Sequence, residues 1–417
     1  MPRLGAWGAT AMIVSEVVGV GIFLTPLTMM RTVGSPGAAL IVWTAMTVLS
    51  AAGALCFAEL GTRFPRDGGP YVFLREGFGE RTAFIYGWMS LVVMDPGLTA
   101  ALAIGFAQYL LIAVGVDGRL IVPVAIIGII AFGLLTMAGM NVSARVLGWS
   151  AAAKIVAVSV LVIAGLTYTR QAPEQIRDLA GFAPSSLAPA IVAAFFAFGG
   201  WWDLGKMAGE FENPRRTLPV ALIAGVVLVG IVYALVTLAM MLSPAWTTGS
   251  SRLLAVVVVI AVAGSLAAVL LGAPRVYVAM AGDHLLPAAL ARFDARRGSA
   301  PRATAVQIVL ACAYVLLGTF DEILGYFVPA AVFFLGLCVL ALMVLPRPTD
   351  ATTFRVPGHP LPMVLFLVLI VAMLGLFAAG QPRQTALGGA VVAAGIPIYS
   401  SVVRRRDLRS ASSARSA

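Results

Sequence analysis

The sequence predicts an all-α protein that crosses a lipid bilayer twelve times. Of its 417 residues, 60% are hydrophobic and only 11% are charged, whereas a soluble domain carries about 25% charged residues. Apolar stretches of about 20 residues, enough to cross a hydrocarbon core of about 30 Å, recur twelve times. The length alone would allow two or three soluble domains, but the hydropathy excludes them.

The predicted spans follow one another with short connections. They are residues 4–30, 37–60, 83–114, 119–139, 146–168, 186–206, 217–242, 252–281, 302–319, 322–345, 360–379 and 384–402. The first apolar run is too long for a signal peptide, lacks a convincing cleavage site and opens a series of similar runs. We therefore expect it to be retained as a helix.

The basic residues predict the orientation of these spans. With the N-terminus placed in the cytoplasm, 21 of the 28 lysines and arginines fall inside, Lys206 among them, six fall outside, and Lys154 lies within a span. This asymmetry places both termini in the cytoplasm and suits a plasma membrane, here a bacterial inner membrane. The net charge of +10 does not indicate nucleic-acid binding, because the arginines lie in short loops and in the basic tail, residues 404–417.

Glycines interrupt two of the predicted helices at matching places. Gly19-Val20-Gly21 lies in the first helix and Gly199-Gly200 in the sixth. Because these helices stand five apart, the pattern predicts two five-helix halves of opposite topology, residues 1–169 and 170–345, followed by two peripheral helices in 346–403. Paired interruptions of this kind point to a transporter binding site. One glycine pair alone would be explained by close helix packing.

Four motifs, taken in order, resemble the L-amino acid transporter (LAT) family of the amino acid–polyamine–organocation superfamily, prokaryotic branch. The motifs are Gly19-Val20-Gly21-Ile22-Phe23-Leu24-Thr25-Pro26, Ala58-Glu59-Leu60-Gly61-Thr62-Arg63-Phe64-Pro65, Phe196-Ala197-Phe198-Gly199-Gly200-Trp201 and Glu212-Asn213-Pro214-Arg215. The resemblance covers nearly the whole chain. It implies ten helices in two inverted repeats, plus two peripheral helices.

The resemblance also implies a substrate site in mid-membrane. The substrate carboxylate would meet the amides of Val20 and Gly21, aided by the helix-end dipole, and the α-ammonium would meet backbone carbonyls. The residues so implied are Val17, Val20, Gly21, Phe196, Gly199, Gly200, Trp202 and Ser265. Phe196 matches the family's gating aromatic, although ordinary packing would also explain it. The family usually has serine at Val20, so a hydroxyl contact to the carboxylate is lost.

Four ionisable residues fall inside predicted spans, namely Glu16, Asp95, Lys154 and Asp203. Charges at such depth are costly and usually functional, although a snorkelling ammonium would explain Lys154. LAT-like sequences have a lysine at the position where sodium-coupled relatives bind a cation. The resemblance therefore implies that the Lys154 ammonium replaces that ion. Alternatively, Lys154 carries a proton. The three acids either accept structural hydrogen bonds, pair with Lys154, bind protons or select cationic substrates.

The sequence indicates transport and not catalysis. His284 and His359 have no cysteine partners at metal-ligand spacing, and no ATP-binding motif or cofactor motif is found. We predict a sodium-independent uniporter or exchanger of neutral L-amino acids that works by alternating access. The alternative is a proton-coupled transporter or antiporter of cationic amino acids or polyamines. A non-transporting nutrient sensor is a different class of function, and we set it aside because a sensor would normally need a soluble signalling domain.

The cysteines predict no covalent partner. Cys56, Cys312 and Cys338 all lie in apolar runs, which argues against a disulfide framework. Animal LAT proteins pair through a cysteine in the loop after the third helix, and the corresponding loop around Val116-Asp117-Gly118 has none. We therefore expect no disulfide-linked heavy subunit.

Overall fold

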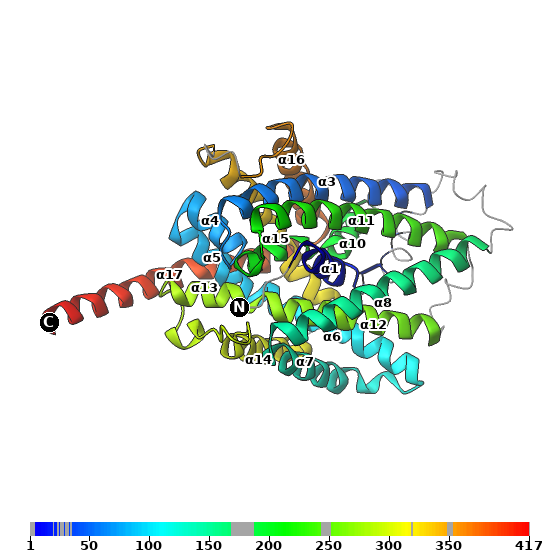
Figure 1. Cartoon of the computed structure of the whole chain (residues 1–417), viewed down its shortest axis with the longest axis horizontal. Coiled ribbons are helices and arrows are strands. Elements are labelled where there is room, and N and C mark those ends of the chain that lie inside the picture. Colours follow the sequence, from blue (N-terminus) through cyan, green and yellow to red (C-terminus); the bar gives the residue numbers. More distant parts are fainter. Residues whose placement is uncertain are drawn as a thin grey trace.

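A computed structural model gives the fold as helices joined by short connections (Figure 1). It describes residues 5–19, 21–22, 25, 29, 33, 36–167, 187–242, 252–317, 320–347 and 353–416, and these contain no β-strand. The α-helices are α1 (Ala6–Val17), α3 (Pro36–Arg63), α4 (Pro70–Phe78), α5 (Glu80–Met89), α6 (Asp95–Val114), α7 (Ile121–Met137), α8 (Met140–Thr167), α10 (Leu187–Phe198), α11 (Pro214–Leu242), α12 (Arg252–Gly272), α13 (Pro274–Gly282), α14 (Pro301–Leu317), α15 (Phe320–Val344), α16 (Leu361–Gly380) and α17 (Pro382–Ser416).

Seven helical segments of the described chain are long and apolar enough to cross a membrane. They are Gly37–Arg63, Glu80–Val114, Gly118–Met137, Pro214–Ala239, Leu254–Gly282, Leu361–Gly380 and Pro382–Val403. Each coincides with one of the spans predicted from the sequence. Helices of this length and hydropathy identify an integral membrane protein.

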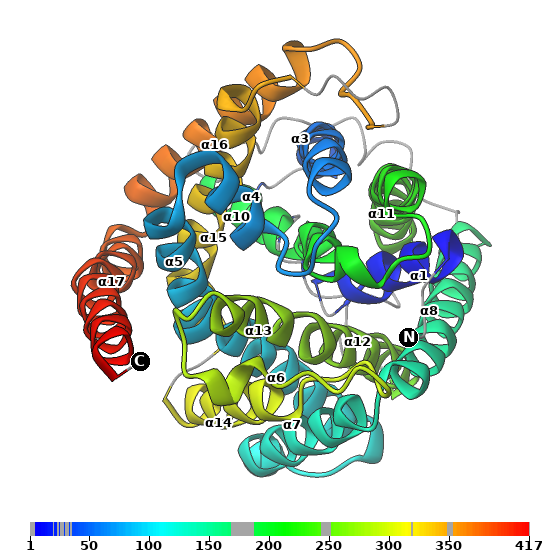
Figure 2. The ribbon, with the colours of Figure 1, turned by 60° about the vertical axis from the view of Figure 1, so that its left-hand side comes forward.

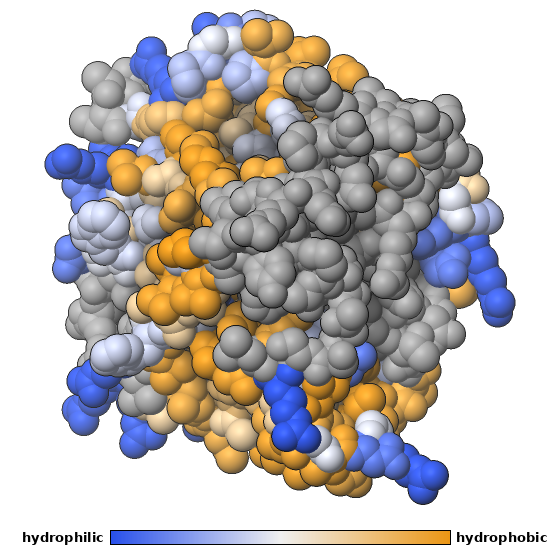
Figure 3. Space-filling model, turned by 90° about the vertical axis from the view of Figure 1, so that its right-hand side faces the viewer, coloured by the Kyte–Doolittle hydropathy of each residue, from blue (hydrophilic) through white to orange (hydrophobic). Residues whose placement is uncertain are grey.

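The outer faces of these helices expose large apolar side chains. Ile127 on α7, Val156 on α8 and Val371 on α16 are each more than 60% exposed. Figure 3 shows hydrophobic side chains over part of the face that it draws, with hydrophilic ones projecting at the edge. Such faces suit contact with lipid tails, because a bilayer removes the cost of exposing apolar surface to water.

Helix α1 lies inside the bundle, where it packs against α8, α11 and α12 (Figure 2). Helix α11 also packs along α3, and α12 packs along α6. The end of α1 is therefore surrounded by protein on several sides. Helix α17 lies at the margin and extends beyond the other helices (Figure 1).

Two helices end inside the bundle at the glycines singled out in the sequence. Helix α1 ends at Val17, just before Gly19. Helix α10 ends at Phe198, and the chain resumes as the short 3₁₀ helix η4 (Trp201–Glu210). Gly200 between them has φ 111°, a backbone conformation that favours glycine because a Cβ is strained there. The sixth predicted span, residues 186–206, is thus two helices.

Candidate functional site

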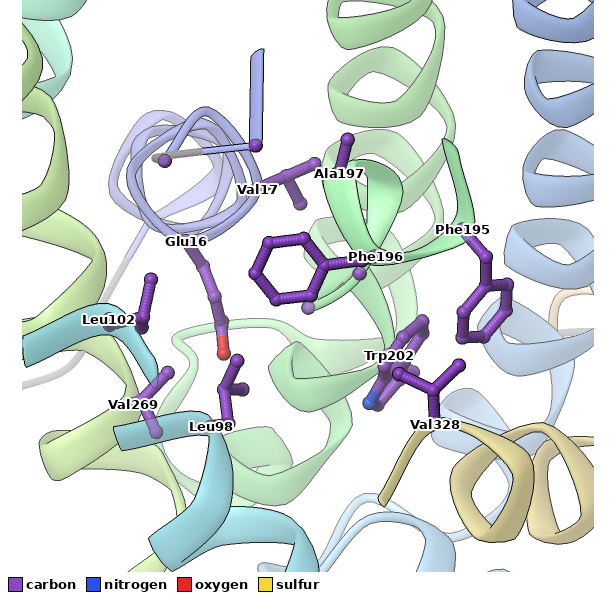
Figure 4. A pocket seen from close by; sticks show the side chains of 14 residues that line it. Glu16, Val17, Leu98, Leu102, Phe195, Phe196, Ala197, Trp202, Val269 and Val328 are labelled. Carbon is purple, nitrogen blue, oxygen red and sulfur yellow. The ribbon is translucent and has the colours of Figure 1, made fainter. Parts of the chain in front are cut away.

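A pocket lies where α1 and α10 end (Figure 4). Phe196 and Trp202 project into it from one side, and Glu16 projects from the other. It is lined by Glu16, Val17, Gly19, Gly21, Leu98, Leu102, Phe195, Phe196, Ala197, Gly199, Gly200, Trp202, Val269 and Val328. Glu16 is the only charged side chain among these lining residues. The pocket is therefore an apolar chamber with one acidic group and the backbone of two helix ends.

Most residues that the sequence implied for a substrate site do line this pocket. They are Val17, Gly21, Phe196, Gly199, Gly200 and Trp202, joined by Glu16. Val20 lies outside the described residues. Ser265 does not line the pocket and lies instead beside Lys154. Sequence reasoning missed the apolar lining residues Leu98, Leu102, Val269 and Val328, because a lone apolar residue in a transmembrane helix carries no signal of its own.

Some of the backbone carbonyls at the two helix ends already accept hydrogen bonds. The Tyr233 hydroxyl, from α11, lies 2.7 Å from the Val17 carbonyl oxygen and 2.6 Å from the Ala197 carbonyl oxygen. The Gly19 amide also donates to the Val17 carbonyl at 2.8 Å, and the Gly199 amide donates to the Phe196 carbonyl at 3.1 Å. Tyr233 therefore joins the ends of α1 and α10. The resemblance implies the carbonyls of Val17, Phe196 and Gly199 for the α-ammonium, and those of Val17 and Phe196 already accept a hydrogen bond.

Two glycines allow these elements to approach closely. A Cβ on Gly21 would lie 2.7 Å from the Cα of Ala197, and one on Gly200 would lie 2.7 Å from the Glu16 Cγ. Separations this short are not tolerated between carbon atoms. The glycines thus serve packing as well as the break itself, and a bulky substitution at Gly21 would disturb the contact between the two helix ends.

Lys154 lies in the middle of α8 and is 1% exposed. Its ammonium donates to the Ser15 carbonyl and lies 3.2 Å from the Ser265 hydroxyl oxygen, which itself donates to the Ser15 carbonyl at 2.8 Å. The ammonium therefore joins α8, α12 and the last turn of α1. Because the side chain turns into the protein, it does not snorkel toward a membrane surface.

A second buried cation, Lys206, lies in η4. Its ammonium nitrogen is 2.9 Å from Asp95 Oδ1 and 2.9 Å from Asp203 Oδ1, and the side chain is 0% exposed. The same Asp95 carboxylate accepts from the hydroxyls of Ser90 and Tyr277. Asp95 thus pairs with Lys206 and not with Lys154. Lys206, counted above with the loop residues on the cytoplasmic side, is instead a buried residue of a 3₁₀ helix.

Asp95 is presented by an irregular turn. The π-helical segment η1 (Ser90–Met94) directly precedes it, and Pro96 follows it. Proline removes a backbone donor, and single π-turns are frequent at functional positions. This local widening places the Ser90 hydroxyl on the Asp95 carboxylate.

Two further ion pairs lie away from the pocket, at the ends of helices. Glu59 pairs with Arg63 and accepts from the Val356 amide at 2.7 Å. Glu210, at the end of η4, lies 3.0 Å from Arg275 Nε. Burial raises the pKa of Glu210, and the Arg275 charge opposes that rise. The Glu210–Arg275 pair joins η4 to α13, and the bond from Val356 joins Glu59 on α3 to the segment before α16.

Comparison with known proteins identifies the class. A family model described as "Amino acid permease" matches residues 4–248. The chain is 29% identical over 409 residues to the b(0,+)-type amino acid transporter 1 of Mus musculus, covering 91% of this chain and 82% of that protein. It is 28% identical over 416 residues to the human cystine/glutamate transporter, covering 93% and 83%.

A bacterial relative matches along almost its full length. The serine/threonine exchanger SteT of Bacillus subtilis (strain 168) is 25% identical over 432 residues, covering 97% of both chains. These relatives are LAT-type and bacterial transporters, which confirms the resemblance carried by the four motifs and identifies a transporter, not an enzyme. The chain belongs to the amino acid permease family.

Proposed function

We propose that this protein is a sodium-independent uniporter or exchanger of neutral L-amino acids that works by alternating access. The observation that carries the proposal is the pocket formed where α1 and α10 both end. Helix ends in a membrane expose backbone groups that suit the charged ends of an amino acid, and an apolar chamber suits an uncharged side chain.

The proposal includes a topology and a location. Twelve spans arranged as two inverted five-helix repeats and two peripheral helices would place the pocket between the repeats. Both termini would lie in the cytoplasm of a bacterial cell, with the protein in its inner membrane. The protein would work without a disulfide-linked heavy subunit, because the loop at Val116-Asp117-Gly118 contains no cysteine.

Sodium independence is supported by the position of Lys154. Its ammonium bonds the Ser15 carbonyl and lies 3.2 Å from the Ser265 hydroxyl oxygen, and both of these oxygens would otherwise be available to a metal cation. A fixed ammonium at this point would supply the positive charge that an ion would bring.

Competition in proteoliposomes tests the substrate class. We expect unlabelled neutral L-amino acids to reduce exchange of a radiolabelled neutral L-amino acid, while D-isomers and polyamines leave it unchanged. No uptake of the neutral label, together with uptake of radiolabelled lysine, arginine or a polyamine, would contradict the neutral class.

One observation favours a second candidate, a proton-coupled transporter or antiporter of cationic amino acids or polyamines. Glu16 places a carboxyl group in the pocket, where it could pair with a cationic side chain. Uptake of neutral and of cationic labels, each in competition with both classes of compound, separates the two candidates, because only the second requires the cationic compounds to be the better substrates.

Phe196 provides a test of gating. Its ring projects into the pocket between α1 and Trp202 (Figure 4), so we propose that it closes over the substrate.

Replacing Phe196 by alanine should lower the transport rate about tenfold or more, which corresponds to about 1.4 kcal/mol. The thermal stability of the purified protein should change less than in a Phe198→Ala variant, because Phe198 is 1% exposed and packs on Trp43 and Tyr233. Wild-type turnover and apparent affinity would show that Phe196 only packs.

A further inference from the structure

The acidic group of the pocket is in contact with a second acid. Glu16, at the last turn of α1, touches the position of a Cβ on Gly200, and Asp203 follows three residues later in η4, so the two carboxyl groups are neighbours. Glu16 is 7% exposed and Asp203 is 2% exposed. Each carboxylate would only accept hydrogen bonds, so a proton on one of the two groups lets one carboxyl donate to the other. Charge repulsion also favours such a proton, because two neighbouring buried carboxylates that are both ionised repel each other.

The surrounding charges decide where the proton lies. Lys206 is 2.9 Å from Asp203 Oδ1 and 2.9 Å from Asp95 Oδ1, so its single charge is already shared by two carboxylates. Because the Lys206 ammonium favours the ionised form of Asp203, a proton shared by the two acids is favoured on Glu16.

The remaining ionisable groups around Glu16 do not neutralise it. Lys154, on α8, interacts with it electrostatically, but its ammonium is directed at the Ser15 carbonyl and the Ser265 hydroxyl. Asp95, on α6, adds a negative charge. On α11, Tyr233 bonds backbone carbonyls, and on α13, Tyr277 bonds Asp95 at 3.1 Å. Glu16 therefore faces the pocket without a cation bonded to it among these groups.

Two backbone carbonyls at the described part of the pocket already accept hydrogen bonds, which leaves the Glu16 carboxylate as the strongest acceptor there for an ammonium group. The Val17 carbonyl already accepts from Tyr233 and Gly19, and the Phe196 carbonyl accepts from Gly199. Glu16 is the one acidic side chain among the lining residues. A Cβ on Gly200 would touch its Cγ, so the glutamate side chain lies directly beside the break between α10 and η4.

We propose that Glu16 exchanges its proton for the α-ammonium of the substrate. In the empty pocket Glu16 carries a proton and donates it to Asp203. When an amino acid binds, the proton leaves to water and the Glu16 carboxylate accepts hydrogen bonds from the α-ammonium. This inference rests on the proposed amino-acid carrier, and it makes Glu16 a substrate-binding residue for amino acids with neutral and with cationic side chains alike.

The experiment measures proton release when substrate binds. Purified protein in nanodiscs is titrated with an amino acid in weakly buffered solution containing a pH-indicator dye, and binding is followed separately with radiolabel. We expect one proton to be released per amino acid bound, and we expect the dissociation constant to rise about tenfold for each pH unit below the titration of the site. Every amino acid that binds should release this proton.

Glu16→Gln keeps the size and a hydrogen-bond donor but cannot titrate. It should bind amino acid about tenfold more weakly or worse, because a bond to a charged group is lost. Its remaining binding should release no proton and should lose its pH dependence. Asp117→Asn is the matched control, because Asp117 is an exposed acid that pairs with Arg119, and it should behave like the wild type.

Three results would overturn the proposal. They are substrate binding without proton release at any pH, unchanged release in Glu16→Gln, and release confined to amino acids with cationic side chains. If no amino acid binds the wild type, the carrier proposal fails, and infrared spectroscopy decides the proton site separately. A protonated carboxyl band that is lost in Glu16→Gln would support the site, and a spectrum identical in the two proteins would overturn it.

Discussion

Replacing Lys206 by methionine is expected to cause the largest loss of stability of any single substitution considered for this protein. The change leaves the Asp95 and Asp203 carboxylates, both within 2.9 Å of the lost ammonium, buried without their cation. Breaking a buried ion pair by removing one partner costs about 3–5 kcal/mol. The midpoint of thermal unfolding of the purified protein in detergent should fall markedly.

A control and a compensating variant sharpen this test. Arg119→Gln removes a cation whose pair with Asp117 is exposed, so its unfolding midpoint should match the wild type. Adding Asp95→Asn to Lys206→Met should restore part of the lost stability, because one unpaired charge is then removed. If Lys206→Met is as stable as Arg119→Gln, the buried pairs do not stabilise the fold.

Replacing Lys154 by alanine is expected to abolish most transport while leaving the amount of folded protein nearly unchanged. The variant removes a charged donor to the Ser15 carbonyl and the Ser265 hydroxyl. Hydrogen bonds to charged groups are worth about 1.5–3 kcal/mol each, so the transport rate should fall by roughly tenfold to a hundredfold. Uptake of radiolabelled amino acid into proteoliposomes provides the measurement.

Two controls separate the roles open to Lys154. Lys154→Arg should rescue little, because a planar guanidinium does not replace a compact ammonium. Replacing sodium by choline should leave wild-type transport unchanged. A strict sodium requirement would contradict ion replacement, and transport driven by an imposed pH gradient that is lost in Lys154→Ala would favour a proton carrier. Full activity of Lys154→Ala would show that the lysine is not needed for transport.

The long apolar helices and the position of the pocket were predictable from the sequence. Hydropathy over about 20 residues reports membrane spans directly, and helices such as α7 and α16 coincide with spans predicted at 119–139 and 360–379. The glycines at 19 and 199–200 indicated where helices end, because glycine both disfavours the helix and allows unusual backbone angles. Six implied site residues accordingly line one pocket.

The charge pairing was not predictable, because it depends on where η4 lies in space. The length of the apolar run at residues 186–206 suggested a single helix, and this helix would place Lys206 at the membrane surface. The break at Gly199-Gly200 instead brings Lys206 to Asp95, a residue 111 positions away. Ser265 was assigned to the pocket for a similar reason, since its position in the chain does not reveal that its hydroxyl lies beside Lys154.

The location of the bound amino acid is the most direct test of this site. Cryo-electron microscopy of the protein with its transported amino acid should show the ligand between the ends of α1 and α10, beside Val17, Glu16, Phe196 and Gly199, with its ammonium within hydrogen-bond distance of the Glu16 carboxylate. An amino acid bound elsewhere, for example in the apolar groove between α8 and α11 that Ile155 and Leu228 line, would contradict the assignment of the pocket.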